Sequence, residues 1–270
     1  RVGAAREELS GALPEWPKKD RAAYVGRHYP AYLLRVDLPR KLAHARFIRE
    51  IDKAKKPLAT EITVRDFEAV TEITIFAPDH PPLLSIIAGA CTIAGANIVD
   101  AQVYTTTDGQ ALDTIAISRE FDTADDEERR ARKVGGLIEE ALAGTLRIPE
   151  QVARKGQRKS RLKPFSVETT VNLDNDLSNQ YTVIECSGLD RPGLLYDLTR
   201  AISDLNLNIA SAHIATFGER AVDVFYVTDL VGAKVTSPAR QTAIRRRLAA
   251  AFAEPAPVAE AKPMKRREPA

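Results

Sequence analysis

The chain has 270 residues, of which 44% are hydrophobic and 28% charged, and its formal net charge is +2. This composition is that of a globular protein of one or two domains, and it excludes a strongly basic or strongly acidic chain. The two cysteines cannot form a disulfide framework. Because no apolar run could span a membrane and no secretory signal opens the chain, we expect a cytoplasmic protein with no membrane partner.

Charge divides the chain into five segments. Basic residues dominate 1–58, acidic residues dominate 59–145, basic residues return in 146–164, and 165–254 is nearly neutral. The tail, 255–270, is rich in proline and alanine. We predict a helical connecting segment, a first domain, a solvated basic linker, a second domain and a disordered tail, in that order. Since the chain starts at Arg1, we also expect a missing upstream region.

The two predicted domains are copies of one another. Asp79-His-Pro-Pro-Leu-Leu84 recurs as Asp190-Arg-Pro-Gly-Leu-Leu195, an offset of 111 residues, and Ala96-Asn-Ile98 recurs as Leu207-Asn-Ile209. The apolar residues between the two motifs keep the same spacing, which is that of one helix face. Each copy therefore predicts a buried helix between a loop and a strand.

The elements around this helix alternate with a period of two. A hairpin precedes the helix, with its first strand at 60–65 or 169–174, and two further strands follow. Thr123 and Ser237 are typical N-caps for a second helix in each copy. The order β-β-α-β-β-α predicts an α+β fold, a ferredoxin-like four-stranded antiparallel sheet with two helices on one face. Its first strand takes the place of the strand that usually closes this fold.

The loop before the helix of the second copy is the candidate binding site. The unpaired N–H groups at a helix start suit a carboxylate, and Gly193 lets a ligand approach the backbone. The carboxylate of Asp190 could accept a hydrogen bond from an ammonium group, and the side-chain amide of Asn208 offers both a hydrogen-bond donor and an acceptor. In the first copy the equivalents are Asp79 and Asn97, but Pro82 replaces the glycine, which argues against binding there.

Simpler roles compete with this one. Asp190 and Asn208 are also ordinary turn residues. Cys91 and Cys186 fall on core faces and are expected to pack there, and the scattered histidines show no metal-ligand spacing. The chain contains neither a Gly-Ser nor a His-Asp dipeptide.

The repeated pattern resembles the ACT domain, a family of small ligand-sensing modules. The tandem copies, and the segment Trp16–Arg49 before them, are similar to the C-terminal part of the bacterial PII-uridylyltransferase/uridylyl-removing enzyme family. The resemblance implies ligand contacts from one set of residues in the second copy, with Asp79 and Asn97 as weaker candidates. That set is Asp190, Arg191, Gly193, Leu194, Asn208 and Ile209.

The resemblance implies that this portion senses an amino acid, expected to be glutamine, for a parent enzyme that modifies the PII protein. Catalytic domains using UTP and Mg²⁺ would lie upstream, because the dipeptides of that family's two active sites are missing here. We expect no catalytic residue, metal or cofactor in this portion. An ACT pair that senses an amino acid for another system is the alternative. Nucleic-acid binding is disfavoured by the acidic charge of the first repeat.

Overall fold

The computed structural model describes residues 1–156 and 167–253. The N-terminal helical segment consists of α1 (Val2–Gly11), α2 (Lys18–Gly26), α3 (Pro30–Arg35) and α4 (Leu38–Ala54). The first repeat consists of β1 (Ala59–Arg65), β2 (Val70–Pro78), α5 (Leu83–Ala94), β3 (Ile98–Thr105), β4 (Gln110–Ser118) and α6 (Ala124–Leu142), and α7 (Ile148–Gly156) follows it. The second repeat consists of β5 (Thr170–Asp174), β6 (Thr182–Leu189), α8 (Leu194–Asp204), β7 (Leu207–Phe217), β8 (Arg220–Asp229) and α9 (Pro238–Phe252).

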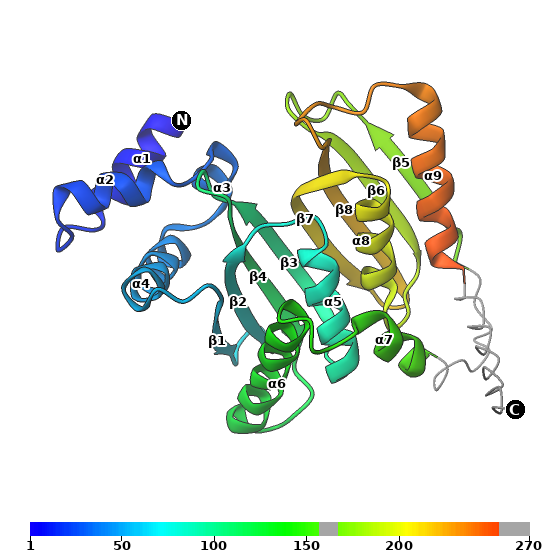
Figure 1. Ribbon diagram of the computed structural model, residues 1–270, viewed down its shortest axis with the longest axis horizontal. Coiled ribbons are helices and arrows are strands. Elements are labelled where there is room, and N and C mark those ends of the chain that lie inside the picture. Colours follow the sequence, from blue (N-terminus) through cyan, green and yellow to red (C-terminus); the bar gives the residue numbers. More distant parts are fainter. Residues whose placement is uncertain (157–166, 254–270) are drawn as a thin grey trace, which may run out of the picture.

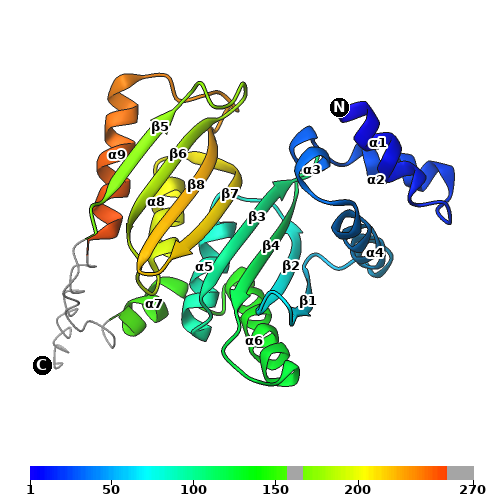
Figure 2. The same cartoon turned by 180° about the vertical axis from the view of Figure 1, so that it is seen from behind.

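Each repeat forms the predicted four-stranded antiparallel sheet. The strand orders are β1-β2-β4-β3 and β5-β6-β8-β7, so the first strand of each repeat lies at the outer edge beside the second. The two inner edge strands, β3 and β7, lie side by side, and the two repeats continue one another across the molecule (Figures 1 and 2). The ferredoxin-like α+β fold predicted from the sequence is confirmed.

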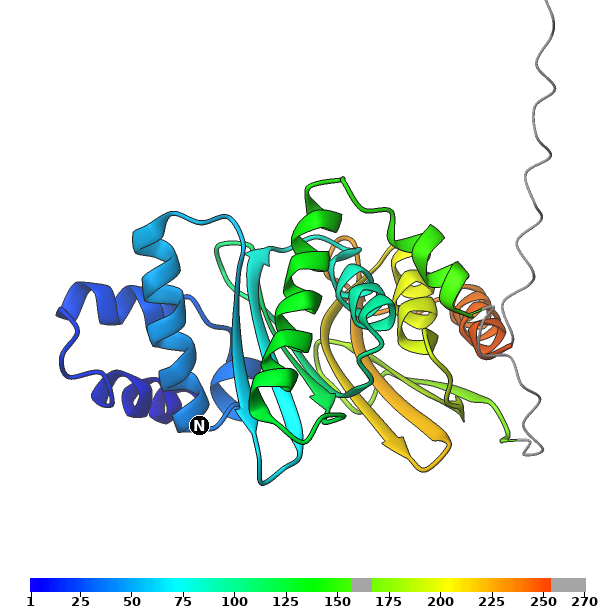
Figure 3. The same cartoon turned by 90° about the horizontal axis from the view of Figure 1, so that it is seen from below.

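The helices cover one face of the sheets because their apolar rows point there (Figure 3). On α5, Leu83, Leu84 and Ile87 are at most 4% exposed, and Leu198 and Ile202 of α8 are fully buried. The predicted N-caps are confirmed as well: the side chains of Thr123 and Ser237 accept hydrogen bonds from the N–H groups of Asp126 and Arg240. Such caps satisfy N–H groups that have no partner inside the helix.

The helical segment packs against the opposite face of the first sheet. Phe76, Tyr104 and Leu112 point to that face and are buried among its apolar side chains. A polar clasp adds to this contact: Arg27 forms ion pairs with Asp52 and Asp108, each at 2.8 Å. The segment is therefore joined to the tip of the β3–β4 hairpin.

Helix α7 lies inside the segment predicted to be a solvated linker, and that prediction is wrong for residues 148–156. Ile148 and Val152 are 4% and 9% exposed and belong to the core that the two repeats share. Ile148 and Val152 are the only large aliphatic residues among the nine of α7, and its basic neighbours hide this short amphipathic helix in the sequence. The rest of the predicted linker, 157–164, and the predicted disordered tail, 255–270, lie outside the described residues.

Gly89 is the point of closest approach between α5, α7 and α8. A Cβ atom at this position would lie 2.2 Å from Cγ2 of Ile148 and 3.1 Å from the ring of Tyr196. Such distances are far below van der Waals contact, so only glycine allows the three helices to pack this closely.

Replacing this glycine should therefore loosen the contact between the repeats. We expect Gly89→Ala to lower the free energy of unfolding by about 1–3 kcal/mol, as overpacking a core does. Gly136→Ala, on α6, is the matched control, because nothing lies within 4 Å of its Cβ position. That control should be more stable than the parent by about 0.5–1 kcal/mol. Urea unfolding of the three proteins measures both effects, and equal stability of the two variants would contradict the assignment.

Two histidines are buried where the helical segment meets the sheet. His28 is 2% exposed and stacks on Tyr32 with ring centroids 4.0 Å apart. His44 is 3% exposed, and its Nδ1 atom lies 3.1 Å from the hydroxyl oxygen of Tyr32. Burial lowers the pKa of His28 to about 3 and that of His44 to about 4, with nearby positive charge adding to the effect. Both rings are therefore neutral in the folded protein at neutral pH.

This burial makes stability depend on pH. In the unfolded chain a histidine takes up its proton below a pKa of about 6.5, whereas folded His28 stays neutral down to about pH 3. The unfolded state then binds more protons, and each such histidine lowers stability as the pH falls below 6.5. We expect His28→Phe to keep the ring stacking. Between pH 7 and pH 5 the free energy of unfolding of this variant should fall by about 2 kcal/mol less than that of the parent. Denaturant unfolding at the two pH values tests this, and identical pH dependence of parent and variant would contradict it.

Candidate functional site

The loop between β6 and α8, residues 189–193, is held in place by backbone geometry. The N–H of Asp190 donates to the carbonyl of Glu219 at 2.8 Å, which ties the loop to the β7–β8 hairpin. Gly193 is the N-cap of α8 and adopts φ +83, a left-handed conformation that favours glycine. The first turn of α8 and the positive end of its dipole thus lie at this loop, where the N–H of Leu194 donates to the carbonyl of Arg191 at 3.1 Å.

Two of the predicted contact residues have structural partners. The guanidinium of Arg191 forms an ion pair with Asp197 at 2.5 Å and donates to the carbonyl of Ala251 at 2.6 Å. It therefore braces the loop against α8 and the end of α9. The side chain of Leu194 is 2% exposed and packs in the core, so only its backbone could reach a ligand.

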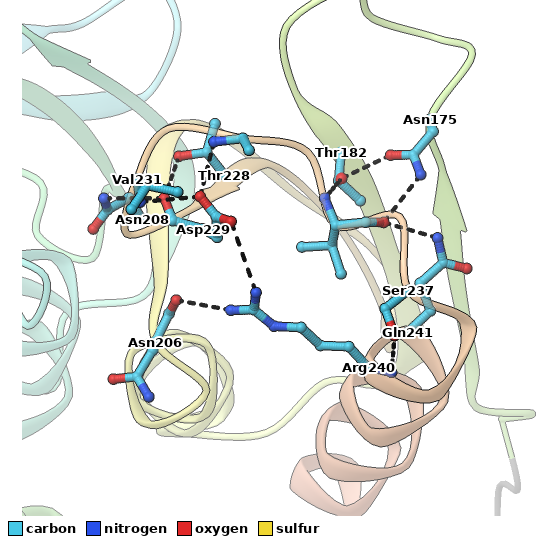
Figure 4. Close-up of polar contacts among 12 residues, drawn as sticks. Asn175, Thr182, Asn206, Asn208, Thr228, Asp229, Val231, Ser237, Arg240 and Gln241 are labelled. Atoms are coloured by element: carbon cyan, nitrogen blue, oxygen red, sulfur yellow. Dashed lines mark hydrogen bonds and ion pairs between the residues drawn. The ribbon is translucent and has the colours of Figure 1, made fainter.

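Asn208 and Ile209, at the start of β7, lie at the other end of α8 from this loop. The 11 residues of α8 separate the two ends by about 16 Å. The Asn208 amide donates to the carbonyl of Asp229 at 3.5 Å, and Arg240 reaches both Asp229 and the carbonyl of Asn206 (Figure 4). The sequence analysis paired Asp190 with Asn208 inside the second repeat. The structure places these two residues at opposite ends of α8, so they do not meet within that repeat.

The loop of the second repeat faces the first repeat instead. The nearest atoms to the Cβ position of Gly193 are Cγ1 of Val152, at 3.5 Å, and Cγ2 of Thr92, at 3.6 Å. Thr92 lies in the last turn of α5, only a few residues before Asn97, whose side chain is exposed. The loop with Asp190 therefore shares its surroundings with the Asn97 end of the first repeat.

The same packing places the first loop beside the second repeat. Gly193 lies next to Thr92 and Tyr196 next to Gly89, so α5 and α8 run in opposite directions. The start of α5 then lies beside the end of α8, where Asn208 follows. The predicted residues thus divide into two composite groups, Asp190 with Asn97 and Asp79 with Asn208.

The two loops are related but differ in shape. In the first repeat, Asp79 donates its N–H to Gly109 at 3.0 Å, as Asp190 does to Glu219, and its carboxylate accepts from the hydroxyl of Thr105 at 2.7 Å. Pro82, the N-cap of α5, has φ −81, whereas Gly193 has φ +83. A proline cannot adopt the conformation of Gly193, so the loops present their backbones differently.

Comparison with known proteins shows which proteins the chain resembles. A family model described as an ACR9-like, ACT-like domain matches residues 170–262. The chain is 62% identical over 250 residues to the bifunctional uridylyltransferase/uridylyl-removing enzyme of Rhodopseudomonas palustris, and 61% identical over 248 residues to that of Bradyrhizobium diazoefficiens. Each match covers 92% of this chain and 27% of the relative, at the relative's C-terminal end. The chain thus corresponds to the C-terminal part of these relatives and consists of two ACT-type repeats after a helical segment. It spans about a quarter of the length of these relatives.

Sequence reasoning missed a buried acid in each ACT repeat. Asp113 on β4 and Asp223 on β8 are 1% and 2% exposed. Burial, and then the charge of Asp79, raises the pKa of Asp113 well above its usual value. Burial, and then the charge of Asp190, raises the pKa of Asp223 to about 7. The signal was available in the sequence: an aspartate interrupts the apolar alternation at matching places of the two repeats.

The two cysteines have a structural role. Cys91 and Cys186 are buried in the core, and burial raises the pKa of both thiols, that of Cys91 to about 12. Within residues 1–156 and 167–253, no cluster of three or more histidine, cysteine or acidic side chains could hold a metal ion. None of the helices in the described ranges combines the length and apolarity that a membrane crossing requires.

If Arg191 braces the loop, its loss should cost stability. Arg191→Ala removes the ion pair with Asp197 and the bond to Ala251, and we expect the free energy of unfolding to fall by about 1–2 kcal/mol. Arg200→Ala, on α8, is the matched control, since the ion pair of Arg200 with Asp204 is 4.0 Å long and half-exposed. The control should change stability by less than about 0.5 kcal/mol. Thermal unfolding of both variants measures the difference, and a similar loss in each would speak against the brace.

Proposed function

We propose that the two ACT repeats form the regulatory portion of a uridylyltransferase/uridylyl-removing enzyme and bind an amino acid, glutamine in the first place, between the repeats. The observation that carries this proposal is the contact of the Gly193 loop with the end of α5. It puts a helix start that suits a carboxylate, the acid Asp190 and the exposed amide of Asn97 at one boundary. Those are the groups that recognise a zwitterion.

The similarity to these relatives extends the proposal to the activity of the whole protein. The whole protein would attach and remove uridylyl groups on the PII signalling protein in the cytoplasm, with UTP and Mg²⁺ bound in catalytic domains outside this chain. The helical segment is the connection on which a signal would travel. Its Arg27 clasp joins it to the β3–β4 hairpin, whose Gly109 carbonyl in turn holds the Asp79 loop.

Binding of nucleic acid to the first sheet is opposed by its packing. Ferredoxin-like sheets that bind RNA stack bases on exposed aromatic side chains of the open face. Here Phe76 and Tyr104 are 4% and 7% exposed, because the helical segment covers them.

The test is isothermal titration of the chain with glutamine and glutamate. We expect glutamine to bind more tightly, because a second carboxylate on the ligand would lie near Asp190. Asp190→Asn should weaken glutamine binding by roughly 10- to 150-fold, the equivalent of a charge-assisted hydrogen bond of about 1.5–3 kcal/mol. Asn97→Ala should weaken the same site, and Asn208→Ala should leave it intact.

Asp125→Asn is the control, because it removes the charge of an exposed aspartate on α6. It should bind as the parent does. If Asn208→Ala weakens the Asp190 site and Asn97→Ala does not, the site lies within one repeat. If neither ligand binds, the proposal for glutamine is wrong.

A further inference from the structure

The buried acids Asp113 and Asp223 occupy equivalent places in the two repeats. Asp113 lies between Ile75 of β2 and Val103 of β3, and Asp223 between Cys186 of β6 and Ile214 of β7. Their strand neighbours two positions away, among them Ile115 and Phe225, are buried on the helix-covered face. Both carboxyl groups therefore point into the apolar layer under the helices rather than to solvent.

In each carboxyl group, only one of the two oxygens has a hydrogen-bond partner. The backbone N–H of Tyr104 hydrogen-bonds to Asp113, and that of Ala215 to Asp223, from equivalent positions of the two edge strands. The other oxygen, Oδ1, is buried and has no hydrogen-bond partner among the described residues in either repeat. A buried acceptor without a donor is costly, so its repetition at matching positions points to a partner that comes from outside the chain.

The open oxygens lie beneath the two candidate loops. The charge of Asp79 acts on Asp113 and that of Asp190 on Asp223, so each loop acid is near the buried acid below it. The same loops carry the starts of α5 and α8. An acid on the loop, a carboxyl oxygen without a donor below it and a helix start beside it match a ligand that has an ammonium group next to a carboxylate.

We propose that Oδ1 of Asp223, and of Asp113 in the first repeat, accepts a hydrogen bond from the ammonium group of an amino acid bound at the loop above it. This inference rests on the proposed function and assigns to that site two residues outside the loops. A metal ion is a poorer fit, because the described residues around each acid offer no third ligand. The assignment also gives the first repeat a binding residue despite Pro82.

The proposal links binding to proton release in the second repeat. The titratable groups that act on Asp223 are Asp190 from the loop and Cys186 from β6. Glu219 belongs to the hairpin that holds this loop, and Arg191 of the loop is engaged with Asp197 of α8. Cys186 stays protonated because burial raises its pKa. An arriving ammonium favours the ionised form of Asp223, whose pKa of about 7 then falls, and the proton leaves to solvent.

Calorimetry of the full chain tests this with L-glutamine and with glutaramate, the same molecule without its ammonium group. Glutamine should bind about tenfold more weakly at pH 6 than at pH 8, and titration in buffers of different ionisation heat should show proton release near pH 7. Asp223→Asn should weaken glutamine binding at least tenfold, abolish the proton release and leave the affinity for glutaramate unchanged. Asp113→Asn should do the same to any second site that the titration resolves.

Asp204→Asn, an exposed acid at the end of α8, is the control and should behave as the parent. If glutamine binds to the parent without proton release and equally well to Asp223→Asn, this inference is overturned while the proposed function stands. If glutamine, and each of the other standard amino acids tried at millimolar concentration, fails to bind to the parent, both are overturned. The proton measurement on the parent decides the matter even if Asp223→Asn does not fold.

Discussion

The antiparallel packing of α5 against α8 determines where everything else in the two repeats lies. Gly89 makes this packing possible, since a single methyl group there would meet Ile148 at 2.2 Å. Through it, the loop of one repeat comes to lie over the helix end of the other, and α7 seals the boundary with Ile148 and Val152. The candidate site is therefore a property of the pair rather than of either repeat alone. Two modules that moved independently would not form it.

The first sheet is buried on both faces, and it is therefore the sheet that connects the repeats to the helical segment. Helices α5 and α6 cover one face, and the helical segment covers the other with a core that includes Phe76 and Tyr104. The edge-to-face contact of Tyr32 with Tyr104 and the ion pair of Arg27 with Asp108 fix the segment to this face. A shift of the β3–β4 hairpin would thus be felt directly by the helices that precede the repeats.

Electrostatics distinguishes the ends of the repeats. At the loop end, each repeat has one acid on the loop and one buried below it, and burial raises the pKa of the buried acid, that of Asp223 to about 7. At the other end of the second repeat, polar groups satisfy one another, as Asn208, Asp229 and Arg240 do (Figure 4). Among the described residues, the buried carboxyl oxygens without a hydrogen-bond partner are Oδ1 of Asp113 and Oδ1 of Asp223, each near the loop acid of its own repeat.

The sequence by itself determined the fold of each repeat. The duplicated spacing around Asp79 and Asp190, the period of two in the strands and the caps Thr123 and Ser237 are local signals, and each produced the predicted element. Local signals also located the two loops. They could not say which loop meets which asparagine, because that depends on helix packing between residues such as Gly89 and Tyr196, which are 107 positions apart.

The tertiary structure alone decided four further points. It separated Asp190 from Asn208 by the length of α8, gave Arg191 a bracing role through Asp197, and made a packed helix of part of the expected linker. It also showed that Asp113 and Asp223 are buried beneath the loops. In each case the reason is the same: burial and contact depend on what the rest of the chain brings alongside a residue, and periodicity along the sequence does not contain that information.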